Sequence, residues 1–153
     1  MRYKILALTL MGLMILVPAH AKRKKRQCSL LVLEVKNATA SVARLQSDPD
    51  HHRTHGYIAF PGESQLIPGA STRWQLRQHP FSGPEGIIEY QFKDPDHKKH
   101  LCTIHYDQSY CGLFMAGNNS SYVIGDCTIY NDPMRPSLRW DWSGHSQVVL
   151  INP

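Results

Sequence analysis

Histidine and aspartate side chains concentrate in two loops that share the sequence Asp-Pro-Asp-His. One loop covers residues 47–55 and the other covers residues 93–100, and together they carry five of the nine histidines. Imidazole and carboxylate groups are suitable ligands for Zn or Cu. The pattern therefore predicts a metal site, and its candidate ligands are His51, His55, His97, His100, Asp50 and Asp96.

The two loops also fit a purely structural interpretation. An Asp-Pro pair favours a type I turn, because the carboxylate accepts backbone hydrogen bonds and the proline fixes its own φ. A metal site further requires three or four ligands that converge from different strands. The sequence leaves both interpretations open, so a secreted metal-binding protein or a small metal-dependent enzyme is one alternative function.

Catalytic motifs are absent from the sequence. It contains no Gly-x-Ser-x-Gly nucleophile motif, no phosphate-binding glycine loop and no His-Glu-x-x-His zinc motif. The four cysteines form an even set, so no single thiol stands out as a nucleophile. We therefore expect a non-enzymatic binding protein that works without a cofactor.

The N-terminal segment 1–21 has the three parts of a secretory signal peptide. Arg2 and Lys4 supply a positive start, residues 5–17 are apolar, and Ala19-His20-Ala21 provides a cleavage site with small residues. The 13-residue apolar run is shorter than the roughly 20 residues that span a bilayer. We expect cleavage at the end of this segment and a secreted or periplasmic mature protein.

The net charge of +5 belongs mainly to the N-terminal region. Two of the 17 basic residues lie in the predicted signal peptide, and five more lie in a basic arm at residues 22–27. The rest of the chain has 10 basic and 12 acidic residues, a net charge of −2, and is a poor match for nucleic acid. A basic arm attracts anionic lipid headgroups, which predicts a peripheral rather than an integral contact with membranes.

An even number of cysteines in a small exported protein predicts disulfides rather than free thiols. A hairpin that turns at residues 106–107 would place Cys102 opposite Cys111, at the cross-strand spacing that a disulfide needs. Cys28 would then bond Cys127. The sequence thus predicts two disulfides.

The chain after the basic arm alternates between apolar and polar residues, which is typical of half-buried β-strands. Ile88, Tyr90 and Phe92 share one face of such a strand, whereas residues 30–35 (apolar except for Glu34) and 148–151 are more continuously apolar, as in central strands. Turn residues such as Pro-Gly and Gly-Asn separate about ten segments of this kind. We predict an all-β protein, in which residues 28–153 form a single antiparallel β-sandwich domain of about ten short strands.

The chain resembles the aegerolysin family of small β-sandwich proteins over most of residues 29–153, and most closely in residues 82–119. In that family a Glu-Gly pair enters a strand of alternating aromatic residues, and an Asp-Pro turn follows. An aromatic-Asp segment then leads to a cysteine and a Gly/Asn loop. The matching residues are Glu85-Gly86, Tyr90, Phe92, Asp94-Pro95, His105-Tyr106-Asp107, Cys111-Gly112 and Asn118, and residues 32–45 are similar to the opening strands.

The resemblance implies a protein that recognises membrane lipids. Aromatic and apolar side chains in loops are then the expected contacts with a lipid or with another cell-surface molecule. These candidates are Tyr106, Tyr110, Leu113, Phe114, Met115 and Tyr122. A disulfide-stabilised effector that binds a host protein is a further alternative, which the sequence does not separate from lipid recognition.

Overall fold

The computed structural model describes residues 30–111, 119–131 and 145–152 of the chain. The predicted signal peptide and basic arm lie outside these ranges. Within the described residues the regular structure is all-β, as expected, and consists of eleven strands. In chain order they are β1 (Leu30–Asn37), β2 (Ala43–Leu45), β3 (Arg53–His55), β4 (Tyr57–Phe60), β5 (Gln65–Leu66), β6 (Ser71–Arg77), β7 (Glu85–Lys93), β8 (Lys99–Asp107), β9 (Tyr122–Gly125), β10 (Cys127–Asn131) and β11 (His145–Ile151).

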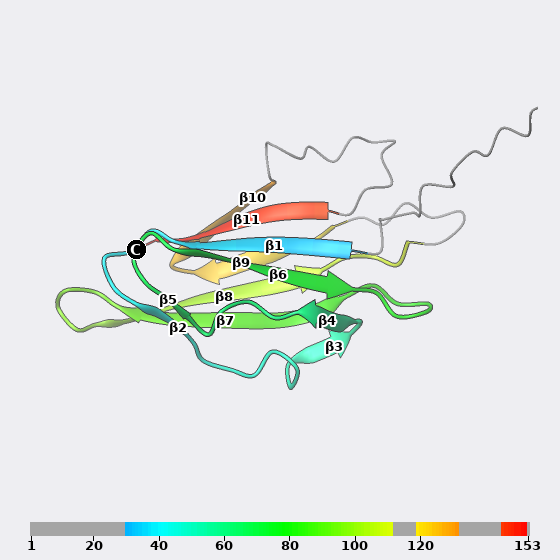
Figure 1. Cartoon of the computed structure of the whole chain (residues 1–153), viewed down its shortest axis with the longest axis horizontal. Helices are drawn as coiled ribbons and strands as arrows, with labels where there is room; N and C mark the ends of the chain where they lie inside the picture. Colours follow the sequence, from blue (N-terminus) through cyan, green and yellow to red (C-terminus); the bar gives the residue numbers. More distant parts are fainter. Residues whose placement is uncertain (1–29, 112–118, 132–144, 153) are drawn as a thin grey trace, which may run out of the picture.

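The strands form two sheets that lie face to face in a sandwich (Figure 1). Sheet A has the strand order β10-β11-β1-β6-β4, and sheet B has the order β5-β2-β7-β8-β9, with β3 also paired to β7. Among the described strands, β1 and β11 form the only parallel pair, so the prediction of purely antiparallel sheets is wrong there. Val32 and Val148 lie on the face of this pair opposite the core residues and are buried as well. Burial of these valines on the outer face explains why residues 30–33 and 148–151 are apolar without alternation.

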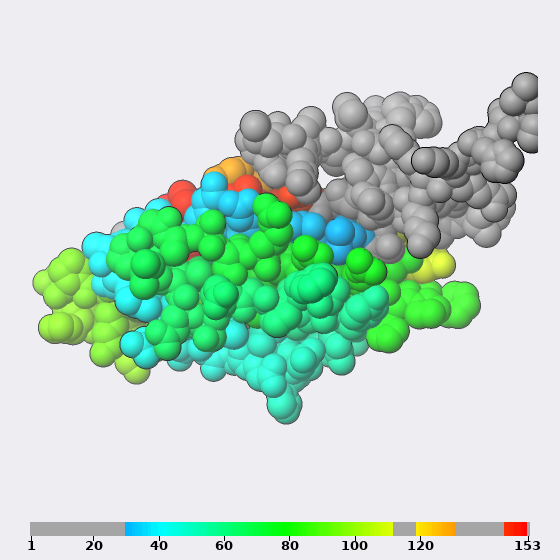
Figure 2. All heavy atoms as spheres, in the orientation of Figure 1, coloured from blue at the N-terminus to red at the C-terminus, as the bar shows by residue number. Residues whose placement is uncertain are grey.

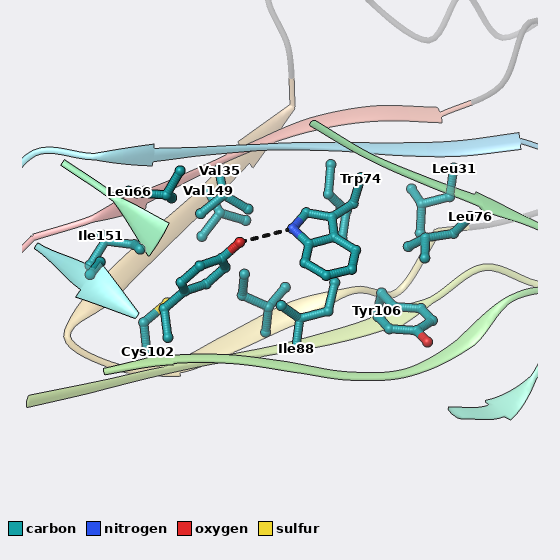
Figure 3. Packing of buried hydrophobic residues seen from close by; sticks show 14 of the residues in the cluster. Leu31, Val35, Leu66, Trp74, Leu76, Ile88, Cys102, Tyr106, Val149 and Ile151 are labelled. Atoms are coloured by element: carbon teal, nitrogen blue, oxygen red, sulfur yellow. Dashed lines mark hydrogen bonds between the residues drawn. The ribbon is translucent and has the colours of Figure 1, made fainter. Parts of the chain in front are cut away.

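Alternation along β6, β7 and β8 places one apolar face of each strand between the sheets (Figure 3). On β7, Ile88, Tyr90 and Phe92 are buried, which confirms the face expected from the sequence. The buried core also includes Leu31, Leu33, Val35, Trp74, Leu76, Cys102, Ile104, Tyr106, Val149 and Ile151. The sequence also alternates over residues 138–142, which predicts Trp140 and Trp142 in the core, but these residues lie outside the described ranges.

Two hydrogen bonds in series lie in the core, and the first of them joins the two sheets. The indole Nε1–H of Trp74 on β6 donates to the hydroxyl oxygen of Tyr90 on β7, at 3.2 Å. The Tyr90 hydroxyl in turn donates to the carbonyl oxygen of Glu63, at 2.7 Å. Burial raises the pKa of Tyr90 to about 12, so the hydroxyl keeps its proton and remains a donor. Tyr90 therefore supplies the acceptor that a buried indole N–H requires.

Tyr90→Phe should lower the free energy of unfolding by about 1–3 kcal/mol, because it leaves the Trp74 N–H and the Glu63 carbonyl without this buried partner. Chemical denaturation of the wild type and the variant measures the difference. The matched control is Tyr122→Phe, which removes the hydroxyl of an exposed tyrosine and should change the stability by less than about 0.5 kcal/mol. Equal denaturation midpoints for the wild type and Tyr90→Phe would contradict the stabilising role of the Tyr90 hydroxyl.

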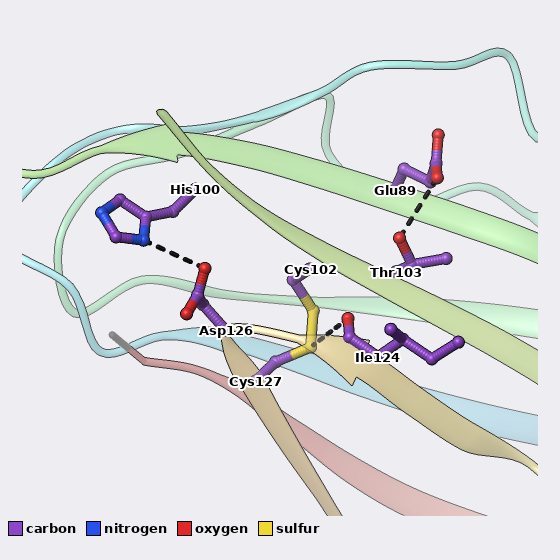
Figure 4. Close-up of a disulfide and its surroundings, with 7 residues drawn as sticks. All are labelled: Glu89, His100, Cys102, Thr103, Ile124, Asp126 and Cys127. Carbon is purple, nitrogen blue, oxygen red and sulfur yellow. Dashed lines mark hydrogen bonds and ion pairs between the residues drawn. A yellow bond between two sulfur atoms is a disulfide. The ribbon is translucent and has the colours of Figure 1, made fainter. Parts of the chain in front are cut away.

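One disulfide lies within the described residues, and it joins Cys102 to Cys127 (Figure 4). The predicted pairs Cys102–Cys111 and Cys28–Cys127 are therefore both wrong. The turn predicted at residues 106–107 does not form, because β8 continues without interruption to Asp107. Cys102 in sheet B instead meets Cys127 at the start of β10 in sheet A, with a Cα–Cα distance of 5.5 Å. Cys111 is not a free thiol, and Cys28 lies outside the described residues.

Candidate functional site

Aromatic side chains gather at the end of the sandwich where β6 connects to β7. The connection contains a tight turn at His79–Ser82, in which the Ser82 N–H donates to the His79 carbonyl oxygen at 3.3 Å. Pro80 occupies the second position of the turn, where its fixed φ is favourable. Phe81 at the third position is 88% exposed, more than any other large apolar side chain in the described part of the chain. Figure 2 shows the green atoms of this loop projecting from the molecule.

The backbone of Phe81 is in the left-handed conformation, with a φ of +80°. This angle matches the third residue of a type II turn, a position that glycine or asparagine usually occupies. A residue with a Cβ costs roughly 1–2 kcal/mol more than glycine in such a conformation. Because the ring is exposed, packing against the core does not explain why phenylalanine is present. Backbone strain of this kind concentrates at functional sites, which makes Phe81 the leading candidate for a functional residue.

A second loop, residues 108–111, follows β8 and lies beside this turn (yellow next to green in Figure 2). The ring of Tyr110 lies next to that of Phe81, with 6.4 Å between the ring centroids. Gln78, which precedes the turn, donates from its Nε2 to the carbonyl oxygen of Cys111 at 3.2 Å. Its Oε1 accepts from the Cys111 N–H at 3.0 Å. The Gln78 side chain thus joins the two loops by bonding both backbone groups of Cys111, its N–H and its carbonyl oxygen.

Backbone packing brings the same two loops into close contact. Gly83 lies against the backbone of Gln108, and a Cβ on residue 83 would overlap the carbonyl oxygen there. On the other side of the turn, His79 contacts the ring of Tyr57, the first residue of β4, edge to face at a centroid distance of 5.6 Å. We call this group the aromatic end, and it consists of Tyr57, His79, Phe81 and Tyr110.

A second set of exposed apolar side chains lies on the outer face of sheet B. Tyr122 and Ile124 on β9 are 50% and 56% exposed, and Leu101 lies beside them on β8. The ring of Tyr122 stacks on that of His105, with 4.5 Å between centroids and an angle of 6° between the planes. These residues occupy regular strands, and none of them has a positive φ. The aromatic end is therefore the stronger candidate for a binding site.

The residues predicted from the sequence to contact lipid are found in different places. Tyr106 is 1% exposed and packs over Gly86 in the core, so it cannot form part of a surface. Tyr110 belongs to the aromatic end, and Tyr122 belongs to the outer face of sheet B. Leu113, Phe114 and Met115 lie outside the described residues.

Sequence reasoning missed both Phe81 and Gln78. The pair Pro80-Phe81 indicates a turn, and a large apolar residue directly after a turn proline was a signal that could have drawn attention to Phe81. No comparable signal identifies Gln78, because its role depends on a loop that lies 33 positions away in the sequence. Its partner becomes apparent only when the ends of β6 and β8 are placed side by side.

The histidines predicted as metal ligands are not brought together. The segment 47–55 ends in β3, which pairs with the start of β7 so that His55 lies opposite Glu85, whereas the segment 93–100 follows the end of β7. The nine residues of β7 span roughly 30 Å. His51, His55 and Asp50 are thus separated from His97, His100 and Asp96. Within the described ranges, no group of three or more His, Cys, Asp or Glu side chains could hold a metal ion.

His100 instead forms hydrogen bonds with two aspartates. Its Nε2 lies 3.1 Å from a carboxylate oxygen of Asp94, and its Nδ1 lies 3.0 Å from one of Asp126 (the latter is drawn in Figure 4). The bond to Asp94, followed by that to Asp126, raises the pKa of His100 above its usual value near 6.5. The bond from His100 also lowers the pKa of Asp94. The group connects the β7–β8 hairpin to the corner between β9 and β10.

The hydrogen bonds of His100 with Asp94 and Asp126 predict that the free energy of unfolding falls in alkaline solution. Because the pKa of His100 is raised on folding, its contribution is fully present below about pH 6.5 and is lost as the pH rises through the folded-state value. His100→Gln should therefore lower the free energy of unfolding more at about pH 6 than at about pH 9. Urea denaturation across this range tests the effect, with His52→Gln at an exposed position as the control. A destabilisation by His100→Gln that does not change with pH would contradict the prediction.

Comparison with known families finds no profile that matches the chain, and no curated protein matches it in sequence. Among solved structures, the chain is similar to the lipid binding protein Nakanori, with a TM-score of 0.51 and 10% sequence identity. The similarity covers 80% of this chain and 70% of that one. At this level of identity it concerns the fold alone, so it supports the sandwich architecture without placing the chain in the aegerolysin family. Within the described residues, no helix has the length and apolar character needed to cross a membrane.

Proposed function

We propose that this chain is a secreted, non-enzymatic protein that binds lipid membranes peripherally, with the aromatic end as its contact. The observation that carries the proposal is Phe81, an exposed aromatic side chain held at the tip of a turn in a strained conformation. The fold gives independent support, because a lipid binding protein has a similar one. The proposed partner is still a lipid, but of the residues at the aromatic end only Tyr110 is among those predicted from the sequence.

The chemistry of the aromatic end suits the interface between headgroups and acyl chains. Transfer of a phenylalanine side chain out of water lowers the free energy of the system. Tyrosine has an apolar ring and a hydroxyl group that stays hydrated at the level of the headgroups. Phe81 is at the tip, and the tyrosines Tyr57 and Tyr110 belong to flanking elements. We infer a contact in which Phe81 enters the apolar region and the tyrosine hydroxyls remain among the headgroups.

Two further features support secretion and a binding role. The predicted signal peptide directs export, and a disulfide between Cys102 and Cys127 suits an oxidising compartment. The sequence contains no catalytic motif, which favours recognition over catalysis.

Vesicle flotation tests the proposal directly. Purified protein is mixed with vesicles of phosphatidylcholine alone, with added phosphatidylserine, or with added sphingomyelin, and we expect it to float with at least one composition. Salt separates the contact at the aromatic end from one made by the basic arm alone, because high salt screens the attraction of exposed charges but not an apolar insertion. Binding that survives about 1 M salt supports the proposal. A failure to bind vesicles of any composition, or the complete loss of binding in high salt, would overturn it.

A further inference from the structure

Two loops from different parts of the chain supply the central aromatic side chains of the proposed site. Phe81 comes from the β6–β7 turn, and Tyr110 comes from the loop after β8. Their rings are 6.4 Å apart between centroids and inclined at 34°, so they form a side-by-side pair rather than a tight stack. A contact between the exposed ring of Phe81 and the half-buried ring of Tyr110 is weak, so further interactions must keep the two loops in register.

The side chain of Gln78 provides one such interaction, beside the backbone hydrogen bond from the Gln108 N–H to the Pro84 carbonyl oxygen at 3.1 Å. Its amide group donates to the Cys111 carbonyl oxygen and accepts from the Cys111 N–H, at 3.2 Å and 3.0 Å. A glutamine amide has the same donor and acceptor groups as a peptide bond, so this pair imitates a link between two neighbouring strands. Tyr110 immediately precedes the residue that is held, and Phe81 lies three residues after Gln78.

We infer that Gln78 is a positioning residue of the lipid-binding surface, and that it makes Phe81 and Tyr110 act as one two-ring insertion unit. This inference rests on the proposed function. Because Gln78 is partly buried and both groups of its amide are bonded to Cys111, its own side chain would not need to touch the lipid. Gln78 would affect lipid binding indirectly, by holding Tyr110 in position.

A double-mutant cycle tests this role. Gln78→Ala should weaken vesicle binding by about three- to tenfold in the wild-type background, which is the size expected for the loss of a hydrogen-bonded link. In the Tyr110→Ser background, the same substitution should change binding by less than about twofold, because the ring that Gln78 positions is absent. Gln75→Ala, at a partly exposed position on β6, is the matched control and should leave binding unchanged.

An equal loss in both backgrounds would mean that Gln78 acts on the fold in general and would overturn the inference. So would a Gln78→Ala variant that binds as well as the wild type. A second measurement needs no lipid: NMR should detect nuclear Overhauser contacts between the rings of Phe81 and Tyr110 in the wild type and lose them in Gln78→Ala. Ring contacts that persist in the variant would overturn the positioning role, whereas wild-type protein that shows them and binds no vesicles would overturn the proposed function instead.

Discussion

Phe81→Gly should weaken binding to lipid vesicles by about 10- to 100-fold while the fold stays intact. The transfer of a phenylalanine side chain from water to an apolar phase contributes about 1.5–3 kcal/mol, which corresponds to that range of affinity. In the free protein the ring is 88% exposed, so nearly all of this free energy is available for a contact with lipid. Few other substitutions in the described chain remove so much exposed apolar surface from one projecting point.

The same substitution should leave the free energy of unfolding unchanged or raise it. Glycine adopts a positive φ freely, so it removes the roughly 1–2 kcal/mol of strain that residue 81 carries at +80°. The greater freedom of glycine in the unfolded chain offsets about 0.5–1 kcal/mol of that gain. A variant that is at least as stable as the wild type and binds far more weakly separates function from folding, which an ordinary core substitution cannot do.

Vesicle flotation and chemical denaturation of the same preparations measure the two effects. Phe60→Ser is the matched control, because Phe60 is also an exposed phenylalanine, at 59%, but lies on β4 opposite the middle of β6. We expect it to bind like the wild type. Undiminished binding by Phe81→Gly would remove this residue from the site, and an equal loss in Phe60→Ser would indicate non-specific attraction of exposed aromatic rings.

Strands that cross the core could be predicted from the sequence because their signal is local. Along β7, the apolar residues Ile88, Tyr90 and Phe92 face the core and the intervening residues are more exposed, as the alternation predicts. The apolar run at residues 30–33 of β1 likewise predicts a central strand, and Leu31, Val32 and Leu33 are all buried. In each case, the residues of one segment contain all the information that the prediction needs.

Pairings between distant segments could not be predicted in this way. The residues 106–107 suggest a hairpin turn, yet β8 continues through them, because Tyr106 is paired with Gly86 across the sheet and its ring fills the space over that glycine. Once β8 continues, Cys102 and Cys111 no longer lie opposite each other, and Cys102 meets Cys127. The parallel pairing of β1 with β11 depends in the same way on the whole topology.

The candidate site depends on the backbone conformation of one turn and on the contact between two loops. Neither can be predicted from the alternation of apolar and polar residues or from the composition. The exposure and positive φ of Phe81 follow from where its turn lies at the end of the sandwich. The two Asp-Pro-Asp-His loops show the opposite case: their sequences are alike, but they lie at opposite ends of β7. Similar loop sequences predict similar turns, but they do not predict whether the two loops lie close together in the fold.

Removing the disulfide by the combined substitutions Cys102→Ala and Cys127→Ala should lower the free energy of unfolding by about 3.5 kcal/mol. The two cysteines are 25 residues apart, and releasing a loop of this length from the unfolded chain accounts for a loss of that size in the chain-entropy description. Alanine is the suitable replacement because Cys102 is fully buried, and serine would add a hydroxyl group to the core.

The loss should have a structural counterpart at one edge of the sandwich. The bond ties sheet B to sheet A next to the corner where β9 passes into β10, so the variant should show faster amide hydrogen exchange in these two edge strands than in β7. Guanidinium denaturation measures the stability, and peptide mapping of the unreduced wild type provides the control by identifying the fragment that contains both cysteines. A map that links Cys102 to Cys111 would contradict this disulfide, and a double variant within about 1 kcal/mol of the wild type would contradict its predicted contribution to stability.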